Sequence, residues 1–479
     1  MKVHDVDVAI LGAGTAGLGA FKAASKYTDR ILLIDGGPLG TTCARVGCMP
    51  SKLLIAAAEA AHQSRHSEIF GVVNSRTTID GKAVMARVQR ERDRFVSFVL
   101  KSIDGIPDAR KIYAFGEFLG DHRLQLSNGD KVDAKAVVIA TGSRPKIPPL
   151  LRNLKSRLLN TDTVFELTEL PKKMAVFGPG VIGLELGQAF SRLGVDIKLF
   201  GVSGGIGGLK DSALKEYALK IFAEEFYLDA KAQVESVEEV DGQVRIRFAD
   251  RQGKMVEELF DYVLAATGRV ANLDQLGLKN TRLLLNDRGL PDFDPFTLQC
   301  GESNIFLAGD ANGDRPLLHE AADEGRIAGD NAAQFPNVRA GLRRTPISIV
   351  FSDPQIASVG LNIEQVKLRC NQCYACGEVS FEDQGRSRVM AQNKGLLHLY
   401  GEHGTGLFLG AEMIGPRAEH IAHLLSWAVQ KRMTVAQMLD MPFYHPVVEE
   451  GLRTGLRDLN AKLKIGPENV KDCMDTGPG

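Results

Sequence analysis

Two cysteines five residues apart, Cys43 and Cys48, are the residues whose type and spacing most directly suggest chemistry. A disulfide between them needs Cα atoms about 4.4–6.8 Å apart, whereas residues at this spacing in an ideal helix are about 7.5 Å apart along the axis alone. A bridge therefore requires a distorted helix start, which Gly47 and Pro50 allow. The spacing leaves two interpretations open, an exchangeable disulfide or two reduced, buried thiols.

Two glycine-rich turns could each hold the pyrophosphate of a dinucleotide. The sequences GAGTAG and GPGVIG, residues 12–17 and 178–183, each follow an apolar segment and precede a helical pattern. In this setting, glycine lets a pyrophosphate approach the N-terminus of a helix. An ordinary tight turn is the alternative for each. The glycines expected to contact nucleotides are Gly12, Gly14, Gly17, Gly178, Gly180 and Gly183.

An acidic residue at the end of the second strand distinguishes the two turns. Asp35 is placed to accept hydrogen bonds from an adenosine ribose. The turns are offset by 178 − 12 = 166 residues, and the same offset from Asp35 leads to Gly201, with no arginine beside it. The second turn thus lacks both the acid that favours NAD and the arginine that favours NADP. The sequence does not determine which of the two it binds.

Two copies of one strand–helix unit must position these turns. Each copy later reaches an apolar strand followed by Thr-Gly, at residues 141–142 and 267–268. Alternating strands and helices of this kind predict doubly wound, parallel α/β folds, and the pattern after Pro346 is typical of an α+β domain. The expected domains are 1–150, 151–278, a segment at 279–345 that completes the first, and 346–479. Helices are expected near residues 51–64, 81–103, 318–333, 417–431 and 434–439.

Composition excludes several classes of protein. The 479 residues are 44% hydrophobic and 24% charged, as in globular proteins, and the net charge of −1 predicts no nucleic-acid partner. No apolar run approaches about 18 residues, so no membrane span is expected. The N-terminus does not have the pattern of a secretory signal. Seven cysteines without such a signal indicate a reducing, cytoplasmic compartment.

The segment TTCARVGCMPSK, residues 41–52, resembles the redox-active disulfide motif of the class I pyridine nucleotide–disulfide oxidoreductases. Within that family it is most similar to the dihydrolipoamide dehydrogenases. The resemblance covers essentially the whole chain, because further motifs match in order. These are ATGSRP at 140–145, ATGR at 266–269, FLAGD at 306–310, SDPQIASVG at 352–360 and the acid–base element YHPVVEE at 444–450.

The resemblance implies FAD on the first nucleotide fold and NAD, or alternatively NADP, on the second. It makes residues 346–479 the dimerisation domain of a homodimer. It also implies that Lys52 lies beside the flavin, paired with Glu185. Cofactor contacts are implied for Thr42, Gly116, Thr141, Gly142, Ser143, Gly268 and Asp310, in addition to Lys52, Asp35 and the two glycine turns.

The resemblance also implies a reaction, the oxidation of dihydrolipoamide through a Cys43–Cys48 disulfide and FAD, with reduction of NAD. Cys43 would exchange with the substrate, and Cys48 would face the flavin as a thiolate. A thiol of pKa about 8.5 is only about 3% ionised at pH 7, so a base must take the substrate proton. The implied base is His445 from the other subunit, oriented by Glu450. The substrate would carry a lipoyl group or be a small disulfide.

Two alternatives remain open. One is an NADPH-dependent, glutathione reductase-like enzyme with another disulfide substrate, and the other is a flavoprotein retained for partner binding. Val181 stands where glutathione reductases usually carry tyrosine, which disfavours that enzyme. Mercuric reductase is disfavoured because the C-terminal vicinal cysteine pair is missing and only Cys473 is present.

The segment CNQCYAC, residues 370–376, lies outside the family pattern. Three cysteines at this spacing can begin an iron–sulfur or zinc site, but the sequence has no fourth ligand at a matching spacing. No metal site is expected, and the role of Cys370, Cys373 and Cys376 stays open.

Overall fold

The computed structural model describes residues 2–74 and 76–466, and its first sheet is built around two long parallel strands, β1 and β6. The second half of each is a continuous buried apolar run, typical of parallel strands covered on both faces. The strand order is β3-β2-β1-β6-β5-β4, and β17 also pairs with β6. The strands are β1 Val3–Leu11, β2 Ile31–Ile34, β3 Lys111–Ile112, β4 Gly116–Gly120, β5 Arg123–Leu126, β6 Lys131–Ile139 and β17 Ile305–Leu307.

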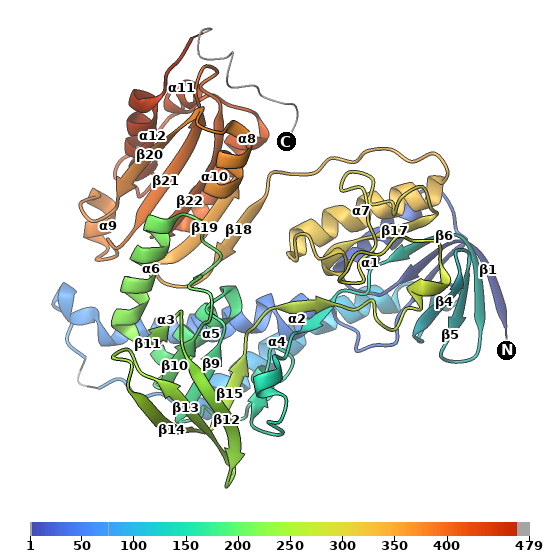
Figure 1. Cartoon of the computed structure of the whole chain (residues 1–479), viewed down its shortest axis with the longest axis horizontal. Coiled ribbons are helices and arrows are strands. Elements are labelled where there is room, and N and C mark those ends of the chain that lie inside the picture. The colour runs from blue at the N-terminus through green and yellow to red at the C-terminus, as the bar shows by residue number, and fades with distance from the viewer. Residues whose placement is uncertain (1, 75, 467–479) are drawn as a thin grey trace.

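The chain returns to this first sheet after it has built the second one. Helix α7 (Leu318–Gln334) follows β17 and packs against α1 (Thr15–Ala24). A Cβ on Gly325 would overlap the carbonyl oxygen of Ala16, so the two helices touch backbone to backbone. Figure 1 shows α1, α7, β6 and β17 together at one end of the molecule. The other helices before residue 110 are α2 Thr42–Val46, α3 Cys48–Arg65 and α4 Gly81–Asp104.

The second sheet is parallel and repeats the plan of the first, in the order β11-β10-β9-β15-β8. A three-stranded antiparallel sheet, β12-β13-β14, packs on one of its faces through aromatic residues that include Phe200 and Phe248. The elements are β8 Leu158–Leu159, β9 Lys173–Phe177, α5 Val181–Arg192, β10 Asp196–Phe200, α6 Ser212–Glu225, β11 Tyr227–Asp229, β12 Val234–Val240, β13 Gln243–Ala249, β14 Met255–Phe260 and β15 Tyr262–Ala265. A short antiparallel pair, β7 (Ser143–Pro145) and β16 (Arg269–Ala271), connects the two units.

The third domain is an antiparallel sheet, β18-β19-β22-β21-β20, with helices against it. It lies over α6 and away from the first sheet, to which a long segment after α7 connects it (Figure 1). Its strands are β18 Ile347–Val350, β19 Gln355–Gly360, β20 Tyr374–Ser380, β21 Leu396–Glu402 and β22 Phe408–Gly415, and its helices are α8 Ile363–Cys370, α9 Gly385–Val389, α10 Ala418–Gln430, α11 Val435–Leu439 and α12 Glu450–Lys462.

The predicted fold class, two doubly wound α/β units followed by an α+β domain, is confirmed. The helices expected from the sequence correspond to α3, α4, α7, α10 and α11. The antiparallel sheet β12-β13-β14 was not predicted. Over the described ranges 2–74 and 76–466, no helix is long and apolar enough to cross a membrane.

Candidate active site

A break between two helices places the cysteine pair. Cys43 lies in α2 and Cys48 is the first residue of α3, with Gly47 between the helices. A Cβ on Gly47 would lie 3.0 Å from the carbonyl oxygen of Thr42, so the chain turns tightly here. This interruption is the distorted helix start that a bridge requires. Both cysteines are free thiols in this structure, and the disulfide between them stays a prediction.

The interaction between the two thiols shifts their pKa values in opposite directions. The hydrogen bond from the Cys43 side chain lowers the pKa of Cys48 to about 7, and the Lys52 ammonium contributes in the same direction. The same hydrogen bond, together with burial, raises the pKa of Cys43 well above its ordinary value. In the reduced pair the negative charge therefore resides on Cys48 near neutral pH.

We expect alkylation of Cys48 by iodoacetamide to rise with pH around a midpoint near 7. In the Lys52→Met variant this midpoint should rise by about one pH unit, since an opposite charge has been removed. Mass spectrometry of the peptide carrying Cys48 measures both midpoints. Lys82→Met, which changes an exposed lysine on α4, should leave the midpoint unchanged. If the alkylation midpoint of the parent protein were near the pKa of an ordinary thiol, Cys48 would not carry the negative charge at neutral pH.

Lys52 and Glu185 form an ion pair that joins all three domains. The Lys52 Nζ atom lies 2.8 Å from Glu185 Oε2, and the Glu185 side chain is only 4% exposed. The other oxygen of Glu185 accepts a hydrogen bond from the backbone N–H of Phe351, 2.9 Å away. Lys52 also lies over the Phe351 ring. The structure thus brings this expected pair together one turn along α3 from Cys48, and adds Phe351, which the sequence did not indicate.

The two glycine turns have the same geometry. Gly12 and Gly178 have φ angles of +108° and +104°, which glycine adopts without strain. In the described part of the chain, the helices α1 and α5 have no side-chain cap, and no atom lies within 4 Å of a Cβ built on Gly14 or Gly180. The first N–H groups of both helices are therefore available to a phosphate. Both turns fit a pyrophosphate.

The ends of the second strands differ as the sequence indicates. The Asp35 carboxylate accepts hydrogen bonds from the backbone N–H groups of Ala13 and Gly37, at 2.5 and 2.6 Å. At the matching position in the second unit, a Cβ on Gly201 would lie 2.7 Å from the Pro179 ring and 2.9 Å from the carbonyl oxygen of Ala230. The proline of the second glycine turn therefore leaves no room for an acidic side chain.

Asp310 meets the Thr-Gly-Ser segment, although about 170 residues separate them in sequence. Its carboxylate accepts a hydrogen bond from the Ser143 hydroxyl at 2.8 Å. Arg269, which follows Thr267-Gly268 in the second unit, donates to the Ser143 hydroxyl and to its carbonyl oxygen. Its position directly after a Thr-Gly pair was the only sequence signal for this contact. The group lies where β7 and β16 pair, between the two nucleotide folds.

Three further residues, Thr42, Gly116 and Gly268, are expected to contact the cofactors. Thr42 is the first residue of α2, and the preceding residue, Thr41, caps that helix because its hydroxyl accepts a hydrogen bond from Ala44 N–H. Gly116 begins β4, where a Cβ would lie 2.8 Å from the Leu11 side chain at the end of β1. Gly268 has a φ angle of +97° and lies between β15 and β16.

His445 and Glu450 contact each other in the third domain. His445 Nδ1 lies 3.0 Å from Glu450 Oε2, and the hydrogen bond from the histidine lowers the pKa of that carboxyl. The His445 side chain is 81% exposed. Helix α12, which begins at Glu450, lies on the far side of the third domain from α2 and its cysteine (Figure 1). Within the described residues, the His445 ring hydrogen bonds to Glu450 and to neither cysteine of the pair.

Three further cysteines lie close together in sequence, at residues 370–376. Cys370 ends α8, Cys376 lies in β20, and Cys373, between them, is disulfide-bonded. Within residues 2–74 and 76–466, no group of three or more His, Cys, Asp or Glu side chains is placed to hold a metal ion. Cys473 is one of the last thirteen residues, 467–479, which lie outside the described part of the chain.

Two protein-family models match the chain. The model described as pyridine nucleotide-disulphide oxidoreductase matches residues 6–325, and that of the corresponding dimerisation domain matches residues 347–455. Dihydrolipoyl dehydrogenase of Chlamydia pneumoniae is 30% identical, over 97% of this chain and 100% of the relative. The dihydrolipoyl dehydrogenase of Geobacillus stearothermophilus is 31% identical, over 93% of this chain and 94% of the relative. Mercuric reductase of Lysinibacillus sphaericus is 30% identical, over 93% of this chain and 81% of the relative.

Solved structures share the fold. The HOCl-induced flavoprotein disulfide reductase RclA from Escherichia coli, solved as a Cu(II) complex, has a TM-score of 0.80 at 21% identity, over 96% of this chain and 100% of that one. LpdA from Mycobacterium tuberculosis has a TM-score of 0.80 at 24% identity, over 94% of this chain and 99% of that one.

Proposed function

Since this chain belongs to the pyridine nucleotide-disulphide oxidoreductase family, we propose that it oxidises dihydrolipoyl groups to lipoyl groups with reduction of NAD. The single observation that carries the proposal is the placement of Cys43 and Cys48 on either side of the break between α2 and α3. The dihydrolipoyl dehydrogenases among its relatives support the choice of substrate.

The family implies FAD and a nicotinamide nucleotide, and the residues present fit both. FAD, when bound, supplies the two-electron redox chemistry that links the thiols to the nicotinamide. The first glycine turn, Asp35, Lys52 and Asp310 would hold it. The second glycine turn, with Gly178 and Gly180, would hold the nicotinamide nucleotide.

The chain's own groups suffice for the exchange with a dithiol. His445 from a second copy of the chain, oriented by Glu450, takes a proton from the substrate thiol. The substrate thiolate attacks Cys43 of the Cys43–Cys48 disulfide, whose S–S bond breaks, and Cys48 leaves as a thiolate. The second substrate thiol, once deprotonated, attacks the substrate sulfur bound to Cys43, which closes the lipoyl disulfide and releases Cys43. Two electrons thus move from the substrate to the cysteine pair.

A second candidate, an NADPH-dependent disulfide reductase, is favoured by one observation. Gly201 and Pro179 exclude the ribose-binding acid that is typical of NAD sites. The mercuric reductase among the relatives belongs to the same family but takes another substrate.

Steady-state assays that cross NAD(H) and NADP(H) with dihydrolipoamide, lipoamide and glutathione disulfide separate the two candidates. We expect turnover of dihydrolipoamide with NAD to exceed the other combinations. Reduction of glutathione disulfide by NADPH, without use of dihydrolipoamide, would replace the first proposal by the second.

A further inference from the structure

A buried carboxylate, Glu324, holds the short turn that carries Asp310. The turn is the 3-10 segment Gly309–Asn312. Glu324 Oε2 accepts one hydrogen bond from the Gly309 backbone N–H and another from the Asn312 side chain, both at 2.7 Å. These bonds fix the two ends of the turn, and Asp310 lies between them. Glu324 is 0% exposed, so its charge needs a partner inside the protein.

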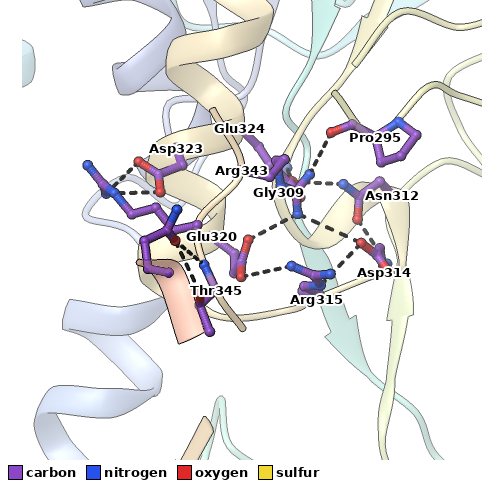
Figure 2. Close-up of polar contacts among 12 residues, drawn as sticks. Pro295, Gly309, Asn312, Asp314, Arg315, Glu320, Asp323, Glu324, Arg343 and Thr345 are labelled. Atoms are coloured by element: carbon purple, nitrogen blue, oxygen red, sulfur yellow. Dashed lines mark hydrogen bonds and ion pairs between the residues drawn. The ribbon is translucent and has the colours of Figure 1, made fainter. Parts of the chain in front are cut away.

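That partner, Arg343, lies beyond α7, the last helix of the first domain. It lies on the segment that connects α7 to β18, and its side chain is 8% exposed. Its Nη2 atom lies 2.9 Å from Glu324 Oε1 and 3.0 Å from Glu320 Oε2, while Nη1 donates to the carbonyl oxygen of Pro295. Figure 2 shows Arg343 between these groups, with Asp314 and Arg315 completing the cluster.

The two residues after Arg343 connect the same segment to helix α7 and to the third domain. Arg344 makes an ion pair with Asp323 of α7 at 2.8 Å; the Arg344 side chain is 62% exposed, whereas Asp323 is buried. The backbone N–H of Thr345 donates to Gln430 at the end of α10, in the third domain. Three consecutive residues thus connect the turn of Asp310, helix α7 and the third domain.

We propose that Arg343 is a positioning residue for the flavin site, because it holds Glu324 and, through it, the turn that presents Asp310, from the segment leading to the third domain. The inference rests on the proposed function, because it assumes that Asp310 binds FAD. Burial raises the pKa of Glu324 to about 7, and the positive charge of Arg343 opposes this shift. Without Arg343 the carboxyl group would take up a proton, and a protonated carboxyl is a weaker acceptor for Gly309 and Asn312.

The test compares Arg343→Met with Arg344→Met, its neighbour in sequence. The readout is the dissociation constant of FAD from the purified full-length protein, measured by the fluorescence of released flavin well below the unfolding temperature. We expect Arg343→Met to weaken FAD binding on the order of tenfold. Arg344→Met should stay within about twofold, because the Arg344 side chain is 62% exposed and pairs with Asp323 rather than with Glu324.

A second variant keeps the inference testable if Arg343→Met folds poorly. In the double variant Arg343→Met/Glu324→Gln, the side-chain amide still accepts from the turn but carries no charge. We expect it to recover most of the lost FAD affinity. Equal FAD affinity in the parent, Arg343→Met and Arg344→Met, or no recovery in the double variant, would overturn the inference. A parent protein that binds no FAD would instead contradict the proposed function.

Discussion

Replacing Cys48 with serine should abolish oxidation of dihydrolipoamide while leaving reduction of the bound flavin by NADH intact. Serine cannot form the disulfide that the substrate attacks, so turnover should fall on the order of a thousandfold or more. In the proposed function the second glycine turn, which does not include this residue, would hold the nicotinamide nucleotide. Steady-state turnover and anaerobic bleaching of the flavin absorbance by NADH measure the two effects separately.

A matched control exists in Cys300, which lies in the core of the first domain. Burial raises the pKa of Cys300 to about 12, so this thiol does not exchange at neutral pH. Cys300→Ala should therefore retain turnover per folded molecule. If Cys48→Ser oxidised dihydrolipoamide at the parent rate, the cysteine pair would not be the reactive disulfide.

Mixing two inactive variants should restore part of the activity. His445→Gln should lower turnover of dihydrolipoamide by about 10²–10⁴-fold, as expected when a general base is lost. When equal amounts of Cys48→Ser and His445→Gln are unfolded and refolded together, half of the dimers should contain one of each chain. Each mixed dimer then has one site with both the intact cysteines and the intact histidine. Recovery should reach about a quarter of the parent activity, because half of the dimers carry one working site of two.

The stoichiometry makes this experiment decisive. If His445 served the cysteines of its own chain, every site in the mixture would lack one group and activity would stay near zero. Refolding the parent alone by the same procedure gives the reference yield. Sedimentation of the mixture confirms that dimers have formed. Unchanged turnover in His445→Gln alone would show that another group takes the substrate proton.

A feature could be predicted from the sequence when residues close to it in the chain determine it. The glycine turns and the break at Gly47 are set by residues within a few positions, and the structure has them where the sequence indicates. The Lys52–Glu185 ion pair joins residues 133 apart and was expected only from the family resemblance. The contacts of Arg269, Phe351 and Arg343 were not predicted, because side chains far apart in sequence give no periodic pattern.

The antiparallel sheet β12-β13-β14 was missed for a different reason. The sheet is an insertion between β11 and β15 of an otherwise regular α/β unit. The strand–helix alternation that identified the unit carries no information about such an insertion. Similarly, Gly201 was recognised as a missing acid, but its cause, the Pro179 ring, required the structure.

The return of β17 and α7 to the first sheet has a consequence for synthesis on the ribosome. Helix α1 ends at Ala24, whereas its partner α7 begins at Leu318. At about 5–20 residues per second, the interval between them takes on the order of 15–60 s. The second domain is synthesised completely during this time, while the face of α1 that packs against α7 stays without its partner. The first domain of the nascent chain therefore closes after the second, and any truncation before Gln334 leaves it unfinished.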